Sequence, residues 1–286
     1  MTKDKIFHSK RTLKAAGKLF DLSTASVMGI LNLTDDSFYD GGQHIQKENA
    51  VLKISQMLDE GAAIIDIGAY SSRPGAQHIS EAEEWNRLKM LLPIVNKEFP
   101  EAIISVDTFR ADIARKSIEN GAHIINDISA GEMDRKMFDT IAKLQVPYIM
   151  MHMQGTPQNM QENPQYDCIQ QDVFKYFKKK VKTLQEKGVK DIIIDPGFGF
   201  GKTVEHNYQL LNNMKALQKL GLPILAGVSR KSMIYKLLES SPQEALNGTS
   251  VIHTLCLQQG ASILRTHDVK EAMECIKIVN FAQNNR

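Results

Sequence analysis

A set of polar residues in this 286-residue chain has the types needed to bind a small organic ligand that is partly anionic. One group carries oxygen acceptors and suits a heterocycle rich in N–H donors: Asp107, Asn126 and Asp195. A second group is cationic and suits phosphates or a carboxylate: Arg73, Lys231, Arg265 and His267. Asn32 offers a neutral oxygen, which suits a hard cation such as Mg²⁺ that bridges phosphates. These types predict a site with one acceptor-rich end and one anion-binding end.

The stretch DPGFGFGKT at residues 195–203 looks like a phosphate-binding loop, but its spacing is wrong. A Walker loop has a glycine separated by four residues from Gly-Lys-Ser/Thr. Gly201-Lys202-Thr203 has the correct end, but Pro196 occupies the position of the first glycine. The dinucleotide fingerprint also fails, because its third glycine would fall at Lys202. We therefore expect a glycine-rich turn after which Lys202 and Thr203 lead into a helix and contact no nucleotide.

Several segments share a pattern that predicts a repeating helix–strand unit: EGAAIID from Glu60, NGAHIIN from Asn120, QGASILR from Gln259 and the looser KGVKDIIID from Lys187. The glycine suits a helix end, where positive φ is often needed, and the apolar run suits a strand buried on both faces. A polar residue then follows at the carboxyl end of each strand: Asp66, Asn126, Arg265 and Asp195.

The apolar runs predict eight strands, at residues 27–31, 63–67, 102–106, 123–126, 147–151, 191–195, 223–226 and 262–265. Amphipathic helical stretches lie between them. This alternation predicts an α/β fold, a single-domain (β/α)8 TIM barrel spanning residues 21–286. Residues 1–20 are expected to form an N-terminal extension or a hairpin that closes the bottom of the barrel. An open doubly wound sheet is the alternative, but no dinucleotide turn follows the first strand.

The active site of such a barrel lies at the carboxyl ends of the strands. Each predicted strand ends in something polar, so all the ligand-binding candidates converge there. We expect Asp66 and Asp127 to support those candidates, and His152 to be a structural histidine.

Composition excludes several classes of protein. The formal net charge of +2 is too small for a nucleic-acid surface, and no run of about 18 apolar residues indicates a membrane span. Three separated cysteines without metal-site spacing are typical of a reducing cytoplasm, where we expect the protein to be located. The sequence lacks HExxH and Gly-x-Ser-x-Gly, which disfavours zinc and serine hydrolases.

Eight motifs between about residues 27 and 272 together resemble the dihydropteroate synthase family, in its order and at its spacing: VMGILNLTDDSFYDGG, SSRPGA, ISVDT, HIINDI, MHMQGTPQNMQ, DPGFGFGK, SRKS and RTHDVKE. The resemblance implies a homodimeric transferase of folate biosynthesis with a TIM-barrel fold. It would join 6-hydroxymethyl-7,8-dihydropterin pyrophosphate to p-aminobenzoate, with Mg²⁺, giving 7,8-dihydropteroate and pyrophosphate. Sulfonamides compete for the p-aminobenzoate site in the family.

The resemblance also implies roles for individual residues, carried over from the motifs above. The pterin would be bound by Asp107, Asn126, Met151, Asp195 and Lys231. Pyrophosphate would be bound by Asn32, Arg265 and His267, and Mg²⁺ by Asn32. The p-aminobenzoate would be bound by Ser72, Arg73, Pro74, Phe200, Lys231 and Ser232. Catalysis would rest on Asp107, Lys231 and Arg265, through positioning and charge stabilisation without a covalent enzyme intermediate.

Two other functions share part of this pattern. A methyltetrahydrofolate–corrinoid methyltransferase would keep the pterin contacts but would not need SSRPGA and SRKS. A catalytically silent pterin-binding protein would be expected to lack Asn32, Lys231 or Arg265, and all of them are present.

The chain departs from the usual family pattern in the loops. Asp35 stands where proline is usual, Tyr39 where serine is usual, and Tyr70 where glutamate is usual. Ser72 replaces threonine and keeps its hydroxyl group. In addition, VDTFRAD lacks the common Lys-Pro.

Overall fold

A computed structural model of the chain describes residues 11–33, 42–71 and 78–285. Within them, parallel strands form one eight-stranded sheet in the order β8-β7-β6-β5-β4-β3-β10-β9. The strands are β3 (Ser26–Asn32), β4 (Ile64–Gly68), β5 (Ile103–Asp107), β6 (Ile124–Asp127), β7 (Tyr148–Met151), β8 (Ile192–Asp195), β9 (Leu225–Ala226) and β10 (Ile263–Thr266). A parallel bridge from Ile194 to Ile224 joins β8 to the segment that leads into β9. This bridge closes the sheet, so the barrel prediction is confirmed and the open sheet is excluded.

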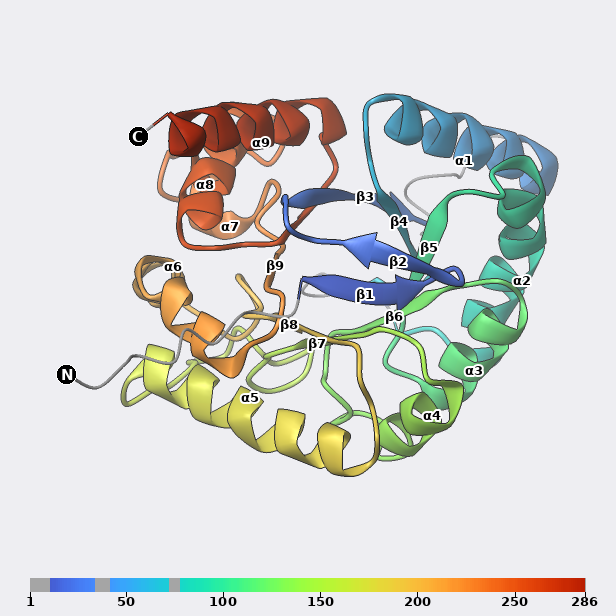
Figure 1. The fold of residues 1–286 in the computed structure, drawn as a ribbon, viewed down its shortest axis with the longest axis horizontal. Coiled ribbons are helices and arrows are strands. Elements are labelled where there is room, and N and C mark those ends of the chain that lie inside the picture. Colours follow the sequence, from blue (N-terminus) through green and yellow to red (C-terminus); the bar gives the residue numbers. More distant parts are fainter. Residues whose placement is uncertain (1–10, 34–41, 72–77, 286) are drawn as a thin grey trace.

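Helices surround the strands, as Figure 1 shows. They are α1 (Gly42–Asp59), α2 (Glu81–Glu98), α3 (Ala111–Glu119), α4 (Met137–Leu144), α5 (Ile169–Glu186), α6 (Val204–Asn212), α7 (Ser232–Tyr235), α8 (Leu246–Gln258) and α9 (Val269–Asn284), with a 3-10 helix η2 at Met214–Leu220. In the described part of the chain, no helix is long and apolar enough to cross a membrane. The main core lies between the strands and the helices, and it includes Ile65, Val106, Ile125 and Phe177.

The repeating unit predicted from the sequence has the expected local structure. Gly61, Gly121 and Gly260 have φ values of 104°, 93° and 91°, and each lies between a helix and the strand that follows it. A side chain at these positions would strain the backbone, because L residues rarely adopt such φ values. The turns therefore bring each chain segment back into the barrel at a fixed place.

A hairpin of β1 (Thr12–Ala15) and β2 (Lys18–Asp21) lies across the amino-terminal end of the barrel (Figure 1). Leu13 and Ala15 of the hairpin, together with Leu22, pack against apolar residues of the barrel strands: Met28, Ile64, Ile124, Ile149, Ile193, Leu225 and Ile263. Full burial of a leucine side chain contributes roughly 1.5–3 kcal/mol. The hairpin thus covers the amino-terminal end of the barrel with apolar side chains. The division of the chain at residue 20 into an N-terminal extension and a barrel domain stays a prediction.

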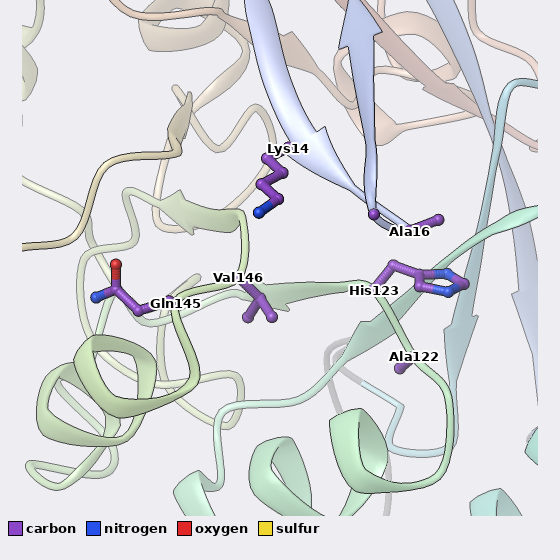
Figure 2. A pocket seen from close by; sticks show the side chains of 7 residues that line it. Lys14, Ala16, Ala122, His123, Gln145 and Val146 are labelled. Atoms are coloured by element: carbon purple, nitrogen blue, oxygen red, sulfur yellow. The ribbon is translucent and has the colours of Figure 1, made fainter.

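A pocket of about 300 Å³ lies at the hairpin tip. Figure 2 shows the side chains that line it. It is lined by Lys14, Ala16, Gly17, Ala122, His123, Gln145 and Val146. Ala122 and His123 precede β6, and Gln145 and Val146 precede β7, so the pocket is at the amino ends of the strands. It lies at the opposite end of the barrel from the predicted site residues, and none of those residues lines it.

Candidate active site

A network of ion pairs and a hydrogen bond joins four strands at the carboxyl-terminal end of the barrel. Arg265 of β10 donates from Nε to Oδ2 of Asp66 at 2.6 Å and from Nη2 to Oδ2 of Asp107 at 2.9 Å. Asn126 of β6 donates to the same Asp66 oxygen at 3.0 Å. Because Asp66 is wholly buried, its carboxylate holds the side chains of Arg265 and Asn126 in fixed positions. The network brings Arg265, Asp107 and Asn126 together, as expected from barrel geometry.

Burial and charge oppose each other in this network. Burial raises the pKa of Asp107 to about 7, against the lowering effect of Arg265. Burial alone would lower the pKa of Arg265, but the carboxylates of Asp66 and Asp107 raise it above its ordinary value. Arg265 therefore remains a cation, and Asp107 titrates near neutral pH.

Asp195, Lys231 and Arg265 converge around Gly227. Asp195 Oδ2 and Lys231 Nζ each lie 3.8 Å from the point that a Cβ on Gly227 would occupy, and Arg265 Cβ lies 4.0 Å from it. The other oxygen of Asp195, Oδ1, accepts a hydrogen bond from Gly197 N at 2.8 Å. Burial raises the pKa of Asp195, while the Lys231 ammonium lowers it. Gly227 leaves room between these groups, and sequence reasoning did not identify it.

Lys231 connects this acceptor-rich end to the glycine-rich turn after β8. Its Nζ donates to the Phe198 carbonyl oxygen at 2.5 Å and lies 4.6 Å from the centroid of the Phe200 ring. Burial lowers the pKa of Lys231 to about 8, and Asp195 opposes that shift. Ser232 is half-buried and is the first residue of α7. Lys231, Phe200 and Ser232 thus belong to one corner of the barrel mouth.

Asn32 and His267 lie near the same network. Asn32 Oδ1 and Asp107 Oδ2 are 3.6 and 3.8 Å from the point that a Cβ on Gly68 would occupy. The His267 amide donates to Ser229 Oγ at 3.2 Å, and that hydroxyl can donate in turn to His267 Nδ1 at 3.0 Å. Burial lowers the pKa of His267 to about 4. The imidazole is therefore neutral at pH 7 and offers an N–H donor, whereas the sequence suggested a cation.

An apolar wall borders the mouth. Met151 is 3% exposed and belongs to a cluster with Tyr70, Ile79, Phe109, Ile128, Met153 and Met160, against which the half-buried Phe200 packs. Tyr70, which departs from the family pattern, contacts a residue of its own loop and residues of two other loops. Its hydroxyl lies 3.1 Å from His78 Nδ1, it accepts from Gln158 Nε2 at 3.1 Å, and its ring packs edge-on against Phe109.

Two of the remaining polar residues at the strand ends have structural partners. Asp127 accepts hydrogen bonds from Ser129 and from the Tyr148 hydroxyl at 2.6 Å. His152 is 6% exposed, and its ring packs against Tyr176. Burial lowers the pKa of His152 to about 2, so the ring is neutral. These contacts agree with the structural role expected for His152.

Lys202, which with Thr203 leads into α6 as expected, is unexpectedly buried. It is 3% exposed, and its Nζ lies within hydrogen-bond distance of His152 Nδ1 at 3.1 Å. Burial lowers the pKa of Lys202 to about 7, while Asp195 raises it. The burial of Lys202 was not predicted from the sequence, because lysine is rarely buried.

Some sequence-predicted residues lie outside the described residues: Ser72, Arg73 and Pro74 of the expected p-aminobenzoate site, and the loop departures Asp35 and Tyr39. In the described ranges, no group of three or more His, Cys, Asp or Glu side chains is arranged to hold a metal ion.

A closed barrel with carboxylates and cations gathered at the carboxyl ends of its strands defines a (β/α)8-barrel enzyme with a polar small-molecule site. The chain matches the family of pterin binding enzymes over residues 28–267. It is 42% identical over 269 residues to the dihydropteroate synthase of Escherichia coli strain K12, a match that covers 93% of this chain and 95% of that relative.

Solved structures agree with the sequence comparisons. The Yersinia pestis dihydropteroate synthase in complex with a sulfonamide drug is similar, with a TM-score of 0.89, 41% identity and coverage of 96% of this chain and 99% of that one. The Xanthomonas albilineans dihydropteroate synthase with 4-aminobenzoic acid has a TM-score of 0.89, 35% identity and the same coverage. The chain therefore belongs to the pterin-binding enzyme family and, within it, to the dihydropteroate synthases.

Proposed function

We propose that this protein is the transferase that joins 6-hydroxymethyl-7,8-dihydropterin pyrophosphate to p-aminobenzoate in folate biosynthesis, releasing 7,8-dihydropteroate and pyrophosphate. The observation that carries the proposal is the convergence of Asp195, Lys231 and Arg265 around Gly227, next to the Asp107–Arg265 ion pair. Carboxylates that face two cations suit a ligand with N–H donors at one end and negative charge at the other. Its small-molecule partners are thus the two substrates.

The pterin is bound at the acceptor-rich end. Its aminopyrimidine edge carries adjacent N–H donors, which suit the Asp195 carboxylate and the Asn126 amide oxygen. Asn126 donates through Nδ2 to Asp66, so its oxygen is the free acceptor of that amide group. Met151 supplies an apolar contact for the ring, and Lys231 contacts the pterin from the other side.

Pyrophosphate is bound at the anionic end. Arg265 supplies a permanent cation, His267 a neutral N–H donor and Asn32 a neutral amide oxygen. Mg²⁺ usually binds few protein ligands, together with phosphates and water, so one Asn32 oxygen close to the Asp107 carboxylate fits such an ion. When bound, the ion would stabilise the charge on the departing pyrophosphate.

The p-aminobenzoate is bound between the glycine-rich turn and α7. The proposed contacts are Ser72, Arg73, Pro74, Phe200, Lys231 and Ser232. The Phe200 ring offers a flat surface for the aromatic substrate, and Lys231 next to it offers positive charge. A sulfonamide drug would compete for this site.

The reaction breaks the C–O bond between the pterin methylene group and pyrophosphate and forms a C–N bond from the aromatic amine. Positive charge develops on the methylene carbon and is delocalised by the pterin ring, and the ionised Asp107 stabilises it. Arg265 stabilises the pyrophosphate that departs with the electron pair. The amine is already uncharged at neutral pH, so it attacks without a strong base and then loses a proton to solvent. Isolation of a covalent pterin–enzyme adduct would contradict this mechanism.

The test is pyrophosphate release from the dihydropterin pyrophosphate in the presence of Mg²⁺, with and without p-aminobenzoate. We expect release that depends on the amine and yields 7,8-dihydropteroate in equal amount. Asp195→Ala is expected to remove pterin binding, measured by calorimetry, while the protein stays folded. Release that ignores the amine would disprove the transferase assignment, and unchanged pterin affinity of the variant would disprove the role of Asp195.

We also propose that the protein is a homodimer and is located in the cytoplasm. Neighbouring helices α8 and α9, which lie together in Figure 1, expose large apolar side chains: Val251 (53%), Leu255 (38%), Ile278 (68%) and Phe281 (74%). Exposed apolar side chains clustered on adjacent helices are typical of subunit interfaces. Sedimentation velocity of the native protein and of Ile278→Glu should show a dimer that the glutamate dissociates, and a native monomer at micromolar concentration would refute the proposal.

The proposed cytoplasmic location is supported by the three cysteines, which are free thiols and suit a reducing compartment.

A further inference from the structure

Lys202 is a buried lysine whose Nζ contacts backbone carbonyl oxygens of two loops. Its Nζ donates to Gly197 O at 2.8 Å and to Phe200 O at 2.9 Å, both in the turn after β8. It also lies 3.3 Å from His152 O, at the start of the loop after β7. Burying a lysine costs solvation free energy, so the residue is expected only where its charge has a use.

The two loops approach each other so closely that only glycine fits between them. A Cβ on Gly197 would lie 1.9 Å from His152 O, and a Cβ on Gly201 would lie 2.5 Å from Gln154 O. Gly197 and Gly201 have φ values of 70° and 60°, which also favour glycine. Carbonyl oxygens of the two loops are thus brought together, and the Lys202 ammonium compensates their mutual repulsion.

Every carbonyl oxygen from residue 197 to residue 201 has a hydrogen-bond donor. Two accept from Lys202, while the remaining donors are Lys231 to Phe198 O, Gln161 to Gly199 O at 2.7 Å and Tyr166 to Gly201 O at 2.8 Å. Lys202 and Lys231 therefore contact the same turn, Lys202 from its buried side and Lys231 from the barrel mouth. The turn is held between the Nζ groups of two lysines.

This arrangement determines where Phe200 lies. Its carbonyl oxygen accepts from Lys202, and its ring lies against the ammonium of Lys231. Without Lys202, Gly197 O would keep only the internal bond from Phe200 N at 3.1 Å, and Phe200 O would lose the donor described here. The Phe200 ring and the Phe198 carbonyl group, which orient Lys231, would then no longer have fixed positions.

We infer that Lys202 is a positioning residue for the p-aminobenzoate half of the site: it fixes the turn at residues 197–201 so that Phe200 and Lys231 face the second substrate. The inference rests on the proposed function, because it assigns the substrate that this turn contacts. Lys202 itself contacts neither substrate. The pterin is bound chiefly by side chains on strands, so it should depend much less on the turn.

The experiment compares Lys202→Met with Lys219→Met, a matched change at an exposed lysine of η2. Amine-dependent pyrophosphate release by the native enzyme is measured first, since its absence would refute the proposed function and not this inference. For Lys202→Met we expect the KM for p-aminobenzoate to rise at least about tenfold, because small displacements of binding groups have large kinetic effects. The dissociation constant of the pterin substrate should change less than about threefold, and Lys219→Met should change neither.

Lys202→Gln is the second variant, because its amide group can still donate two hydrogen bonds to the turn carbonyls. We expect it to fold even if the methionine variant does not, and to recover part of the affinity for p-aminobenzoate. Circular dichroism and thermal melting check folding. If folded variants have a lower melting temperature but a native KM for p-aminobenzoate, Lys202 only stabilises the fold and the inference is wrong. Equal losses of affinity for both substrates would also overturn it.

Discussion

Replacement of Asp66 by alanine should reduce stability and activity together, because this residue orients two proposed ligand-binding side chains. Asp66 Oδ2 accepts from both Arg265 and Asn126, and the side chain is wholly buried. The alanine variant leaves the Arg265 guanidinium paired with Asp107 alone and leaves an Asn126 N–H without its acceptor. Neither residue would keep the orientation proposed for it in substrate binding.

The expected magnitude follows from the burial of these groups. Breaking a buried ion pair typically costs about 3–5 kcal/mol, and the remaining contact with Asp107 favours the lower end, about 3 kcal/mol. For a chain of this size, 1 kcal/mol corresponds to roughly 2–4 °C in Tm, so we expect a decrease of about 6–12 °C. Displacement of Arg265 by about 1 Å can cost about 100-fold, which sets the expected loss in kcat/KM.

Asp66→Asn separates orientation from charge. Its amide oxygen can replace Oδ2 and accept from Arg265 and Asn126, while its NH₂ group takes the place of Oδ1, which has no partner within the described residues. Stability should fall by about 1–3 kcal/mol because a buried donor is unsatisfied. Because both hydrogen bonds persist, kcat/KM should stay within about tenfold of the native value.

The assays are thermal melting, followed by initial rates of amine-dependent pyrophosphate release at a temperature where all variants are folded. A kcat/KM for Asp66→Ala within about threefold of the native value would show that Arg265 and Asn126 do not need Asp66 for their orientation. The account of the network given above would then be wrong.

The barrel could be predicted from the sequence because the apolar runs that indicate its strands are local patterns. Seven of the predicted apolar runs form strands whose ends lie within one residue of the prediction, since a strand buried on both faces needs continuous hydrophobicity. The seventh strand is the exception: residues 223–226 were predicted, but β9 contains only Leu225–Ala226. Pro223 has no N–H to donate, so the barrel closes there through its carbonyl oxygen, which accepts from Ile194 N, and through the bridge to Ile224.

The polar residues at the strand ends could also be predicted from local patterns. The hydrogen-bond partners of their side chains could not. Arg265 and Asp66 are 199 residues apart, and no local pattern couples them. The burial of Lys202 is not predicted, because Gly-Lys-Thr is compared only with nucleotide-binding loops, and the failure of that comparison suggests no other role. Apart from His152 Nδ1, its partners are backbone carbonyl groups, which carry no sequence signal. Gly227 was missed because its contribution is the space that it leaves between other side chains.

Two further predictions concern the acceptor-rich end and the glycine-rich turn. Gly197→Ala should lower the free energy of unfolding in urea by more than about 3 kcal/mol, because the added Cβ would meet the His152 carbonyl oxygen at 1.9 Å. The control is Gly188→Ala, where φ is similar but the space is open, and it should lower the free energy of unfolding by only about 1 kcal/mol. Equal costs would refute the close approach of the loops. The proposed mechanism needs Asp107 ionised and Lys231 protonated. Since burial raises the pKa of Asp107 to about 7 and lowers that of Lys231 to about 8, kcat/KM should rise as the pH passes about 7 and fall as it passes about 8. Asp107→Asn should lower kcat/KM and remove the acid limb while the alkaline limb remains, and an unchanged acid limb would show that another group controls it.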